Sequence, residues 1–140
     1  MAKEFRVKVL TPGRELFRGE ATEVLLPAYD GEVGVLSGHG DFIGLLGTGP
    51  LKVVTNGNDF WFMLSGGAYR VADGELAILA EQGEAPADSD LAAASADAKE
   101  LERKLSDLKL FSTDNFTVWK RQLDQAKARV EIHRRTEVVN

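Results

Sequence analysis

The sequence predicts an antiparallel β-sandwich or barrel followed by an antiparallel hairpin of two helices. Up to about residue 80, short runs of alternating apolar and polar residues are separated by turns that contain glycine or proline. This pattern is typical of an all-β domain. From residue 91 on, apolar residues recur at intervals of three and four in two successive segments, which is the period of packed helices. We therefore expect a β-domain at residues 1–84, a linker at 85–90 and a helical hairpin at 91–140.

Short strands joined by tight turns account for the β-domain. The first run, "FRVKVL", alternates apolar and basic residues, and "TPGR" supplies a proline and a glycine for the turn that follows it. Further strand-like runs lie at residues 15–19, 23–26, 33–36, 43–46, 51–55, 60–64, 68–72 and 75–80. Asn56-Gly57 and Asp73-Gly74 predict hairpin turns of type I′, because that type requires a positive φ at both central residues.

The run "FWFML" at residues 60–64 is apolar at every position. Alternation along a strand places Trp61 and Met63 on the face opposite to the other three residues. A strand that is buried on both faces needs a second layer outside the sandwich, since an uncovered patch would favour aggregation. We expect this layer to be either the C-terminal half of the chain or a partner protein.

Two helical segments follow the linker, with Ser89 or Asp90 as the N-cap of the first. The apolar positions of the first helix are Leu91, Ala94, Ala98, Leu101, Leu105 and Leu108. "FSTDN" ends this pattern, and Ser112 or Thr113 is a candidate cap for the second helix. The second helix repeats the spacing at Phe116, Trp119, Leu123, Ala126 and Val130. Two helices alone bury little apolar area, so the hairpin is expected to dock on another surface or to move.

The chain is acidic overall but ends in a basic segment. Its net charge is −5, of which residues 117–140 contribute +3 and the remaining residues −8. The basic segment is expected to meet an acidic partner, to bind the acidic body, or to be a solvated helix face. The overall acidity argues against nucleic acid as the main ligand.

The residue content excludes further classes. The chain has no cysteine, which removes disulfides, thiolate zinc sites and cysteine nucleophiles. Strand-like alternation begins within five residues of the start, and no run approaches the about 18 apolar residues of a membrane helix. We therefore expect a soluble, cytoplasmic protein without a secretory signal.

Two glycine-rich stretches suggest nucleotide sites, but neither fits one. In "DGEVGVLSGHGDFIGLL", at residues 30–46, no lysine follows the glycines and the next residues are strand-like, so neither a P-loop nor a dinucleotide fingerprint is present. "LSGG" at residues 64–67 matches the signature of ABC transporter nucleotide domains, but the chain has no Walker A motif to accompany it. We interpret these glycines as turn residues.

No catalytic or metal centre is predicted. Ser37, His39 and Asp41 alternate along one short stretch, but alternation does not establish the geometry of a triad. Asp30 and Glu32 could act as an acid and a base, although such a pair is common on an acidic surface. The residues available near His39 do not complete a metal shell. We expect no enzyme activity, no metal and no cofactor, with His39 as a hydrogen-bonding or interface residue.

With these patterns in order, several stretches match one family: "VLTPGRELFRGEATEVLLPAYDGEVGVLSGHGDF", "GPLKVV", "LSGG" and "ADGELAILAE". The chain resembles the epsilon subunits of F-type ATP synthases over essentially its whole length. The specific part is "DGEVGVLSGHG", which is similar to the family's D/E-G-E-x-G-x-L-x-G-H stretch, with Ser37 where proline is usual. The resemblance implies a β-domain followed by a helical hairpin.

The resemblance further implies a non-catalytic rotor subunit of the central stalk, with the gamma subunit and the ring of c subunits as partners. The implied contacts with gamma and the c ring are Asp30, Glu32, His39, Trp61 and Met63. The turn at residues 30–32 would face the c ring and the neighbourhood of His39 would lie near gamma. Residues 60–64 would be covered either by gamma or by the folded-down hairpin.

In the family the hairpin moves between a position against the sandwich and an extended one that inhibits ATP hydrolysis. When extended, it brings basic residues to an acidic segment of a catalytic beta subunit. The corresponding candidates here are Lys120, Arg121, Lys127, Arg129, Arg134 and Arg135. Part of their charge is expected to be neutralised within the helix, where Asp124 and Glu131 follow lysines at i+4.

Some members of the family bind ATP through a motif of the type [IL]-D-x-x-R-A. The corresponding stretch here, residues 89–94, keeps Asp90 and Ala94 but has Ala93 in place of the arginine. Because an arginine would supply a cation for phosphate, we expect weak ATP binding or none.

The resemblance implies a peripheral subunit at the cytoplasmic face of a bacterial inner membrane or, alternatively, at the stromal face of a thylakoid membrane. Two other classes remain as alternatives. A free-standing ligand-binding sandwich would need a concave apolar pocket, and a small hydrolase would lose its turnover on His39→Ala.

Overall fold

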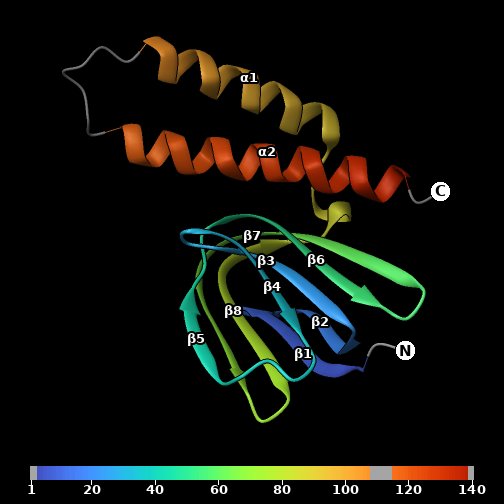
Figure 1. Ribbon diagram of the computed structural model, residues 1–140. Helices are drawn as coiled ribbons and strands as arrows, with labels where there is room; N and C mark the ends of the chain where they lie inside the picture. The colour runs from blue at the N-terminus through green and yellow to red at the C-terminus, as the bar shows by residue number, and fades with distance from the viewer. Residues whose placement is uncertain (1–2, 108–114, 139–140) are drawn as a thin grey trace.

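The computed structural model describes residues 3–107 and 115–138 of the chain (Figure 1). Within these residues the strands are β1 (Phe5–Thr11), β2 (Arg14–Ala21), β3 (Glu23–Ala28), β4 (Gly31–Leu36), β5 (Phe42–Leu45), β6 (Thr48–Thr55), β7 (Asn58–Ala72) and β8 (Glu75–Glu84). A short 3₁₀ helix, η1 (Pro86–Asp88), leads to α1 (Leu91–Asp107) and α2 (Phe116–Val138). The predicted fold class, an antiparallel sandwich followed by a two-helix hairpin, is confirmed.

The strands follow the hydrogen-bonded order β2-β1-β8-β7-β6-β3-β4, with β5 added to β7. Neighbouring strands are antiparallel except β1 and β8, which are parallel. The alternation in "FRVKVL" buries Phe5, Val7 and Val9 in the core and turns the two basic side chains outward. Leu26, Leu51, Leu64, Leu76 and Ile78 are fully buried in the same core.

One strand replaces the two that were expected at residues 60–64 and 68–72. Within "SGG", Gly66 has φ +75° and Gly67 has φ +115°, so the chain bends there without leaving the sheet. β7 keeps one register with β8 on both sides of the bend, but on its other edge it pairs with β6 before the bend and with β5 after it. The expectation of a break was wrong because the glycines change the direction of the strand and leave its pairing with β8 intact.

The two predicted hairpin turns differ. Asp73 and Gly74 both have positive φ, +52° and +74°, as the predicted type I′ turn requires. In the turn between β6 and β7 only Gly57 is positive, at +94°, so the type I′ prediction is wrong there. A turn that needs positive φ at one position places it on glycine and leaves asparagine in its ordinary region.

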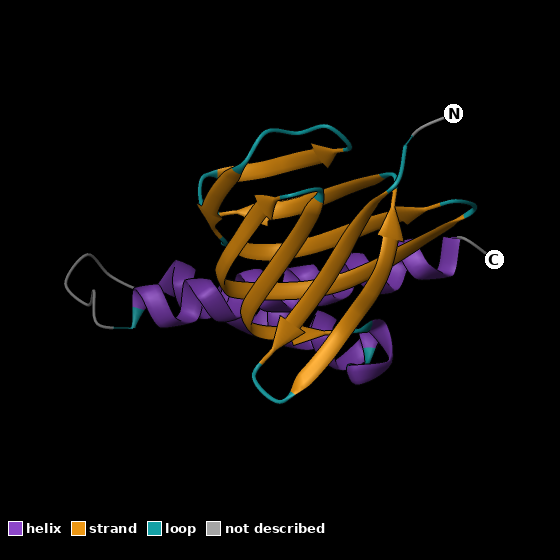
Figure 2. Cartoon of the chain, turned by 90° about the horizontal axis from the view of Figure 1, so that it is seen from below, coloured by secondary structure: helices purple, strands orange, loops and turns teal. Residues whose placement is uncertain are grey.

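The helices form a third layer on one side of the sandwich (Figures 1 and 2). α2 lies between α1 and the strands; it packs mainly on β6 and β7 and also contacts η1, and its side chains reach β8. Ala94 of α1 and Leu123 and Ala126 of α2 are buried along the predicted seam. Leu108, Ser112 and Thr113 lie outside the described residues. α1 therefore rests on the sandwich mainly through α2.

Candidate functional site

The outer face of β7 is covered by α2, which supplies the second layer predicted for "FWFML". Met63 is fully buried beneath Ala128 and Ile132. Trp61 packs at the side of this small cluster. The ammonium of Lys52 lies 5.4 Å from the ring centroid, and the guanidinium of Arg135 on α2 lies 5.6 Å from it. The covering layer is thus the C-terminal half of the chain, and its apolar contact is small.

Polar contacts with Ser65 make up a second part of this interface. The Ser65 side chain is fully buried, and its Oγ lies 2.8 Å from Thr48 Oγ1 on β6. Arg121 Nε and Gln125 Nε2, both on α2, donate hydrogen bonds to the same oxygen at 3.0 Å each. A serine of the sandwich thus binds two side chains of the helix.

Two carboxylates and an amide of β8 complete this polar contact. Arg121 Nη2 donates to Glu81 Oε2 at 3.1 Å, and Gln125 donates to the side-chain carbonyl of Gln82. One turn further along α2, Arg129 binds Glu84 through two parallel bonds of 2.8 and 2.7 Å. The hydrogen bonds that Arg129 donates to the Glu84 carboxylate raise the pKa of Arg129 above its ordinary value. We call Thr48, Ser65, Glu81, Gln82, Arg121 and Gln125 the Ser65 cluster.

The linker is attached at both ends. Asp88 accepts hydrogen bonds from Arg14 Nη2 and from the Ala85 amide, both at 2.7 Å. These bonds, with that of Arg14 the larger cause, lower the pKa of the Asp88 carboxyl. Ser89 Oγ lies 3.0 Å from His133 Nε2 on α2. The segment that joins the two parts of the chain is therefore bound to both of them.

The six basic residues expected to reach a beta subunit have different neighbours in this arrangement. Arg121 and Arg129 bind carboxylates of the sandwich. Lys120 pairs with Asp124 and Arg135 with Glu131, both within α2 at 2.7 Å. Lys127 approaches Glu102 of α1 at 3.7 Å, and Arg134 is exposed near the end of α2.

The residues expected at gamma and the c ring do not lie together. β3 and β4 form a hairpin whose turn contains Asp30, and β4 then leads away to the loop that contains His39. Asp30 and Glu32 are exposed at one end of β4, and His39 is exposed beyond the other. His39 Nδ1 lies 3.0 Å from the carbonyl oxygen of Gly40. Trp61 and Met63 belong to a third place, under α2.

The opposite side of the sandwich has an uncovered apolar row. Leu10, Leu79, Ala68 and Leu45 are cross-strand neighbours on β1, β8, β7 and β5. Leu45 is 65% exposed and Leu79 55%, and the adjacent Ile43 is 71% exposed. A parallel row beside it contains three cations, Arg18, Lys8 and Arg70. We call the first set the outer row; it is the kind of surface that a partner protein covers.

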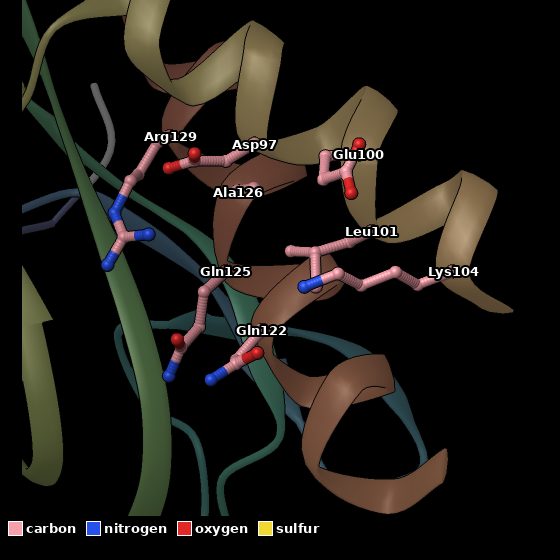
Figure 3. A pocket seen from close by; sticks show the side chains of 8 residues that line it. All are labelled: Asp97, Glu100, Leu101, Lys104, Gln122, Gln125, Ala126 and Arg129. Carbon is pink, nitrogen blue, oxygen red and sulfur yellow. The ribbon is translucent and has the colours of Figure 1, made fainter. Parts of the chain in front are cut away.

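A cleft of about 330 Å³ lies between the two helices (Figure 3). α1 contributes Asp97, Glu100, Leu101 and Lys104, and α2 contributes Gln122, Gln125, Ala126 and Arg129. Its two acidic and two basic side chains balance, and Arg129 extends away from α1 to its bond with Glu84. This lining does not favour a polyphosphate, which needs an excess of cations.

Asp90 has a structural role at the start of α1. Its Oδ2 accepts a hydrogen bond from the Ala93 amide at 3.2 Å, which is the contact of an N-cap. Among the described residues, no group of three or more histidine, aspartate or glutamate side chains is placed to hold a metal ion. Residues 91–107 and 116–138, the two helices, include no stretch apolar and long enough to span a membrane.

Sequence reasoning did not select Ser65, Glu81, Glu84 or Gln125. A weak signal was present, because Arg121, Gln125, Ala128 and Ile132 recur at intervals of four, three and four along α2. This is a second helical face beside the predicted seam. Because this face mixes polar and apolar side chains, it has no apolar periodicity.

Comparison with known proteins agrees with this architecture. Residues 4–86 match the family model described as the β-sandwich domain of the ATP synthase delta/epsilon chain. The ATP synthase epsilon chain of Solibacter usitatus is 36% identical over 104 residues, 74% of this chain and 78% of its own length. That of Prochlorococcus marinus is 34% identical over 128 residues, 89% of this chain and 93% of its own.

A solved structure extends the likeness to the whole chain at the level of fold. A chain of the Euglena gracilis mitochondrial ATP synthase, from a structure of OSCP, F1 and c-ring, superposes with a TM-score of 0.67 at 21% identity. The match covers 97% of this chain and 81% of the other. The matched sandwich, the relatives aligned along nearly the full length and the shared fold lead to one conclusion: this chain belongs to the ATP synthase epsilon chain family.

Proposed function

We propose that this chain is a non-catalytic subunit of the central stalk of a rotary ATP synthase, which helps to couple ion movement through the c ring to ATP synthesis. Membership of the epsilon chain family is the main support. The observation that carries the proposal is that the sandwich has two distinct surfaces. One bears the uncovered apolar row, and the other binds the hairpin. One surface can bind a neighbouring subunit permanently while the other element remains free to change position.

The gamma subunit is assigned to the outer row. Leu45 and Leu79 of this row, which both neighbour Ala68, are more than half exposed. The parallel row beside it contains the exposed Ile43 and the cations Lys8, Arg18 and Arg70. An apolar strip with a polar border is typical of a subunit interface. The exposed turn with Asp30 and Glu32 is assigned to the polar loops of the c ring, and the chain is held at the membrane only through the complex.

The hairpin is assigned an inhibitory role in ATP hydrolysis. Its basic residues would meet an acidic segment of a catalytic beta subunit after α2 leaves the sandwich. Lys120, Lys127 and Arg134 are available before release, because among the described residues they make neither an ion pair nor a cation–π contact with the sandwich, whereas Arg135 lies 5.6 Å from the Trp61 ring centroid. Arg121 and Arg129 become available only on release.

The membrane is assigned as a bacterial inner membrane at its cytoplasmic face, with the stromal face of a thylakoid membrane as the alternative. Neither a metal, a cofactor nor a nucleic acid is part of the proposal. In the described residues the charge-balanced cleft between the helices gives no support for ATP binding.

The test is reconstitution with the cognate catalytic complex, which contains gamma and lacks this subunit. The full chain is expected to bind, and Leu79→Asp is expected to weaken binding at least tenfold, because it places a charge in the outer row. Val118→Asp on α2 is the matched control, since Val118 is 54% exposed and Leu79 55%. Equal binding of both variants would remove the outer row as the gamma interface, and no binding by the unsubstituted chain would remove the proposed function.

The inhibitory role is tested in the same complex by following ATP hydrolysis. The triple variant Lys120→Gln, Lys127→Gln, Arg134→Gln leaves the contacts of α2 with the sandwich in place. It is expected to bind as tightly as the unsubstituted chain but to inhibit hydrolysis less. Arg103→Gln on α1 is the charge control. If the triple variant inhibits fully, these three side chains do not meet the beta subunit.

A further inference from the structure

The "LSGG" motif at residues 64–67 has no role in the function proposed above, yet its serine hydroxyl takes part in three hydrogen bonds at the helix–sandwich interface, two of them with α2. We propose that Ser65 is a positioning residue that holds α2 on the sandwich, so that the Ser65 cluster sets the balance between a docked and a released hairpin. This deepens the proposed function, on which its regulatory meaning rests.

The hydrogen bonds of Ser65 are complete only when α2 is docked. A hydroxyl has one proton to donate and two lone pairs that accept. Arg121 Nε and Gln125 Nε2 have only protons to offer and occupy both acceptor positions at 3.0 Å. The Ser65 proton is therefore left for Thr48 Oγ1, 2.8 Å away. Removing this hydroxyl would take the shared acceptor from a proton of Gln125, which is buried, and from a proton of Arg121, whose side chain is 44% exposed.

The glycine that follows Ser65 makes room for this contact. A Cβ on Gly66 would lie 2.8 Å from Glu81 Oε2 and 2.9 Å from Arg121 Nη2. The ion pair between Arg121 and Glu81 therefore occupies the space that a side chain at position 66 would need. Ser65 therefore supplies an acceptor for Arg121 of α2, and Gly66 supplies the space that Arg121 needs.

Polar contacts decide whether the hairpin docks because the apolar contact is limited. The buried apolar cluster under α2 contains Met63, Ala128 and Ile132, whereas α2 binds Ser65, Glu81, Gln82 and Glu84 through polar side chains. On release these groups exchange protein partners for water, so the net difference in free energy is small. A small difference suits a reversible element, and a single lost hydroxyl can then shift its position.

The experiment uses the absence of cysteine from the chain. Met63→Cys places one thiol beneath Ala128 and Ile132, where a thiol reagent reaches it only after α2 leaves. Adding Ser65→Ala is expected to raise the labelling rate of this thiol about tenfold. The reason is that α2 loses two hydrogen bonds, one donated by the charged Arg121 and one by the polar Gln125. Thr55→Ala, which removes a hydroxyl at the turn between β6 and β7, is the matched control and is expected to leave the rate unchanged.

A second thiol separates release of α2 from unfolding of the sandwich. Val53 is fully buried inside the sandwich core, so Val53→Cys reports on its opening. Ser65→Ala is expected to leave labelling of Val53→Cys unchanged. If both thiols react faster to the same extent, Ser65 stabilises the sandwich rather than the docked helix. If labelling of Met63→Cys does not change, Ser65 does not hold α2 on the sandwich. Either result overturns the inference.

A double-mutant comparison tests the route through Arg121. If Ser65 acts through the helix, Ser65→Ala and Arg121→Gln together raise the labelling rate less than the product of their separate effects. Independent effects would overturn the inference. If Met63→Cys itself fails to fold, amide hydrogen exchange in α2 of the Ser65→Ala chain gives the same comparison. All these measurements use the isolated chain, so their failure is distinct from failure to bind the catalytic complex.

Discussion

Arg129 and Glu84 are joined by two parallel hydrogen bonds, Nε to Oε1 at 2.8 Å and Nη2 to Oε2 at 2.7 Å. Glu84 is the last residue of β8, and Arg129 lies in the middle of α2. The pair therefore ties the helix to the point where the chain leaves the sandwich. Both side chains are about one quarter exposed, so water screens them only in part.

Replacing either member of this pair is expected to weaken docking of the hairpin. Arg129→Lys should cost about 1–2 kcal/mol in docking free energy, because lysine cannot make two parallel bonds with one carboxylate. Glu84→Gln should have a similar effect. Amide hydrogen exchange in α2 is the measurement, and exchange in the sandwich should not change. Glu100→Gln is the control, since Glu100 pairs with Arg103 on its own helix; equal exchange in all three variants would contradict the prediction.

Gly67→Ala is expected to destabilise the sandwich by about 3 kcal/mol or more. Gly67 has φ +115°, and a Cβ there would lie 2.0 Å from the carbonyl oxygen of Leu79. Urea unfolding of the full chain measures the effect. The control is Gly40→Ala, because a Cβ at Gly40 meets nothing within 4 Å and its φ is ordinary. A loss below about 1 kcal/mol for Gly67→Ala would mean that β7 can bend without a glycine here.

The bond between Asp88 and Arg14 is expected to make the linker sensitive to acid. The pKa of Asp88 is lowered in the folded chain from its ordinary value of 3.8. Its stabilising contribution is therefore complete above that value and disappears as the pH falls through the lowered pKa. Asp88→Asn should cost about 0.5–1 kcal/mol at neutral pH, and the difference should shrink as the pH falls below 3.8 and vanish below the lowered pKa. Urea unfolding at several pH values is the measurement; a difference that persists in acid would point to another cause.

Asp90 is expected to act as a helix cap without a role in nucleotide binding. Asp90→Ala should destabilise α1 by about 1 kcal/mol, because the Ala93 amide loses its acceptor, whereas Asp90→Asn should cost less. ATP at physiological concentration should leave the amide spectrum of the unsubstituted chain unchanged. A clear shift of resonances from residues around the interhelical cleft would contradict this prediction.

Much of the fold could be predicted because it depends on local periodicity. Alternation in "FRVKVL" correctly indicated Phe5, Val7 and Val9 as buried, and the predicted seam correctly indicated Ala94, Leu123 and Ala126, although Phe116 of the same seam is 50% exposed. Asp73-Gly74 correctly indicated a type I′ turn. Such patterns follow from residue type and the geometry of a single strand or helix, and so they appear in the sequence without knowledge of distant neighbours.

The interface between the hairpin and the sandwich could not be predicted in the same way. Periodicity placed Trp61 and Met63 under a second layer but left open which surface covers them. Arg121 was expected to meet a beta subunit rather than the sandwich, and Gln125 was not selected. "SGG" was expected to separate two strands, because nothing local distinguishes a glycine that bends a strand from one that ends it.

The sequence by itself determined two periods, their boundary, the turn glycines and the family to which the chain belongs. Only the tertiary structure decided that α2, rather than α1, faces the sandwich, and that Ser65 binds Arg121 and Gln125. These partners are 56 and 60 residues apart. The hydrogen bonds between them form only when α2 packs on the sandwich and brings the two donors to the buried hydroxyl of Ser65. No local sequence pattern predicts this contact.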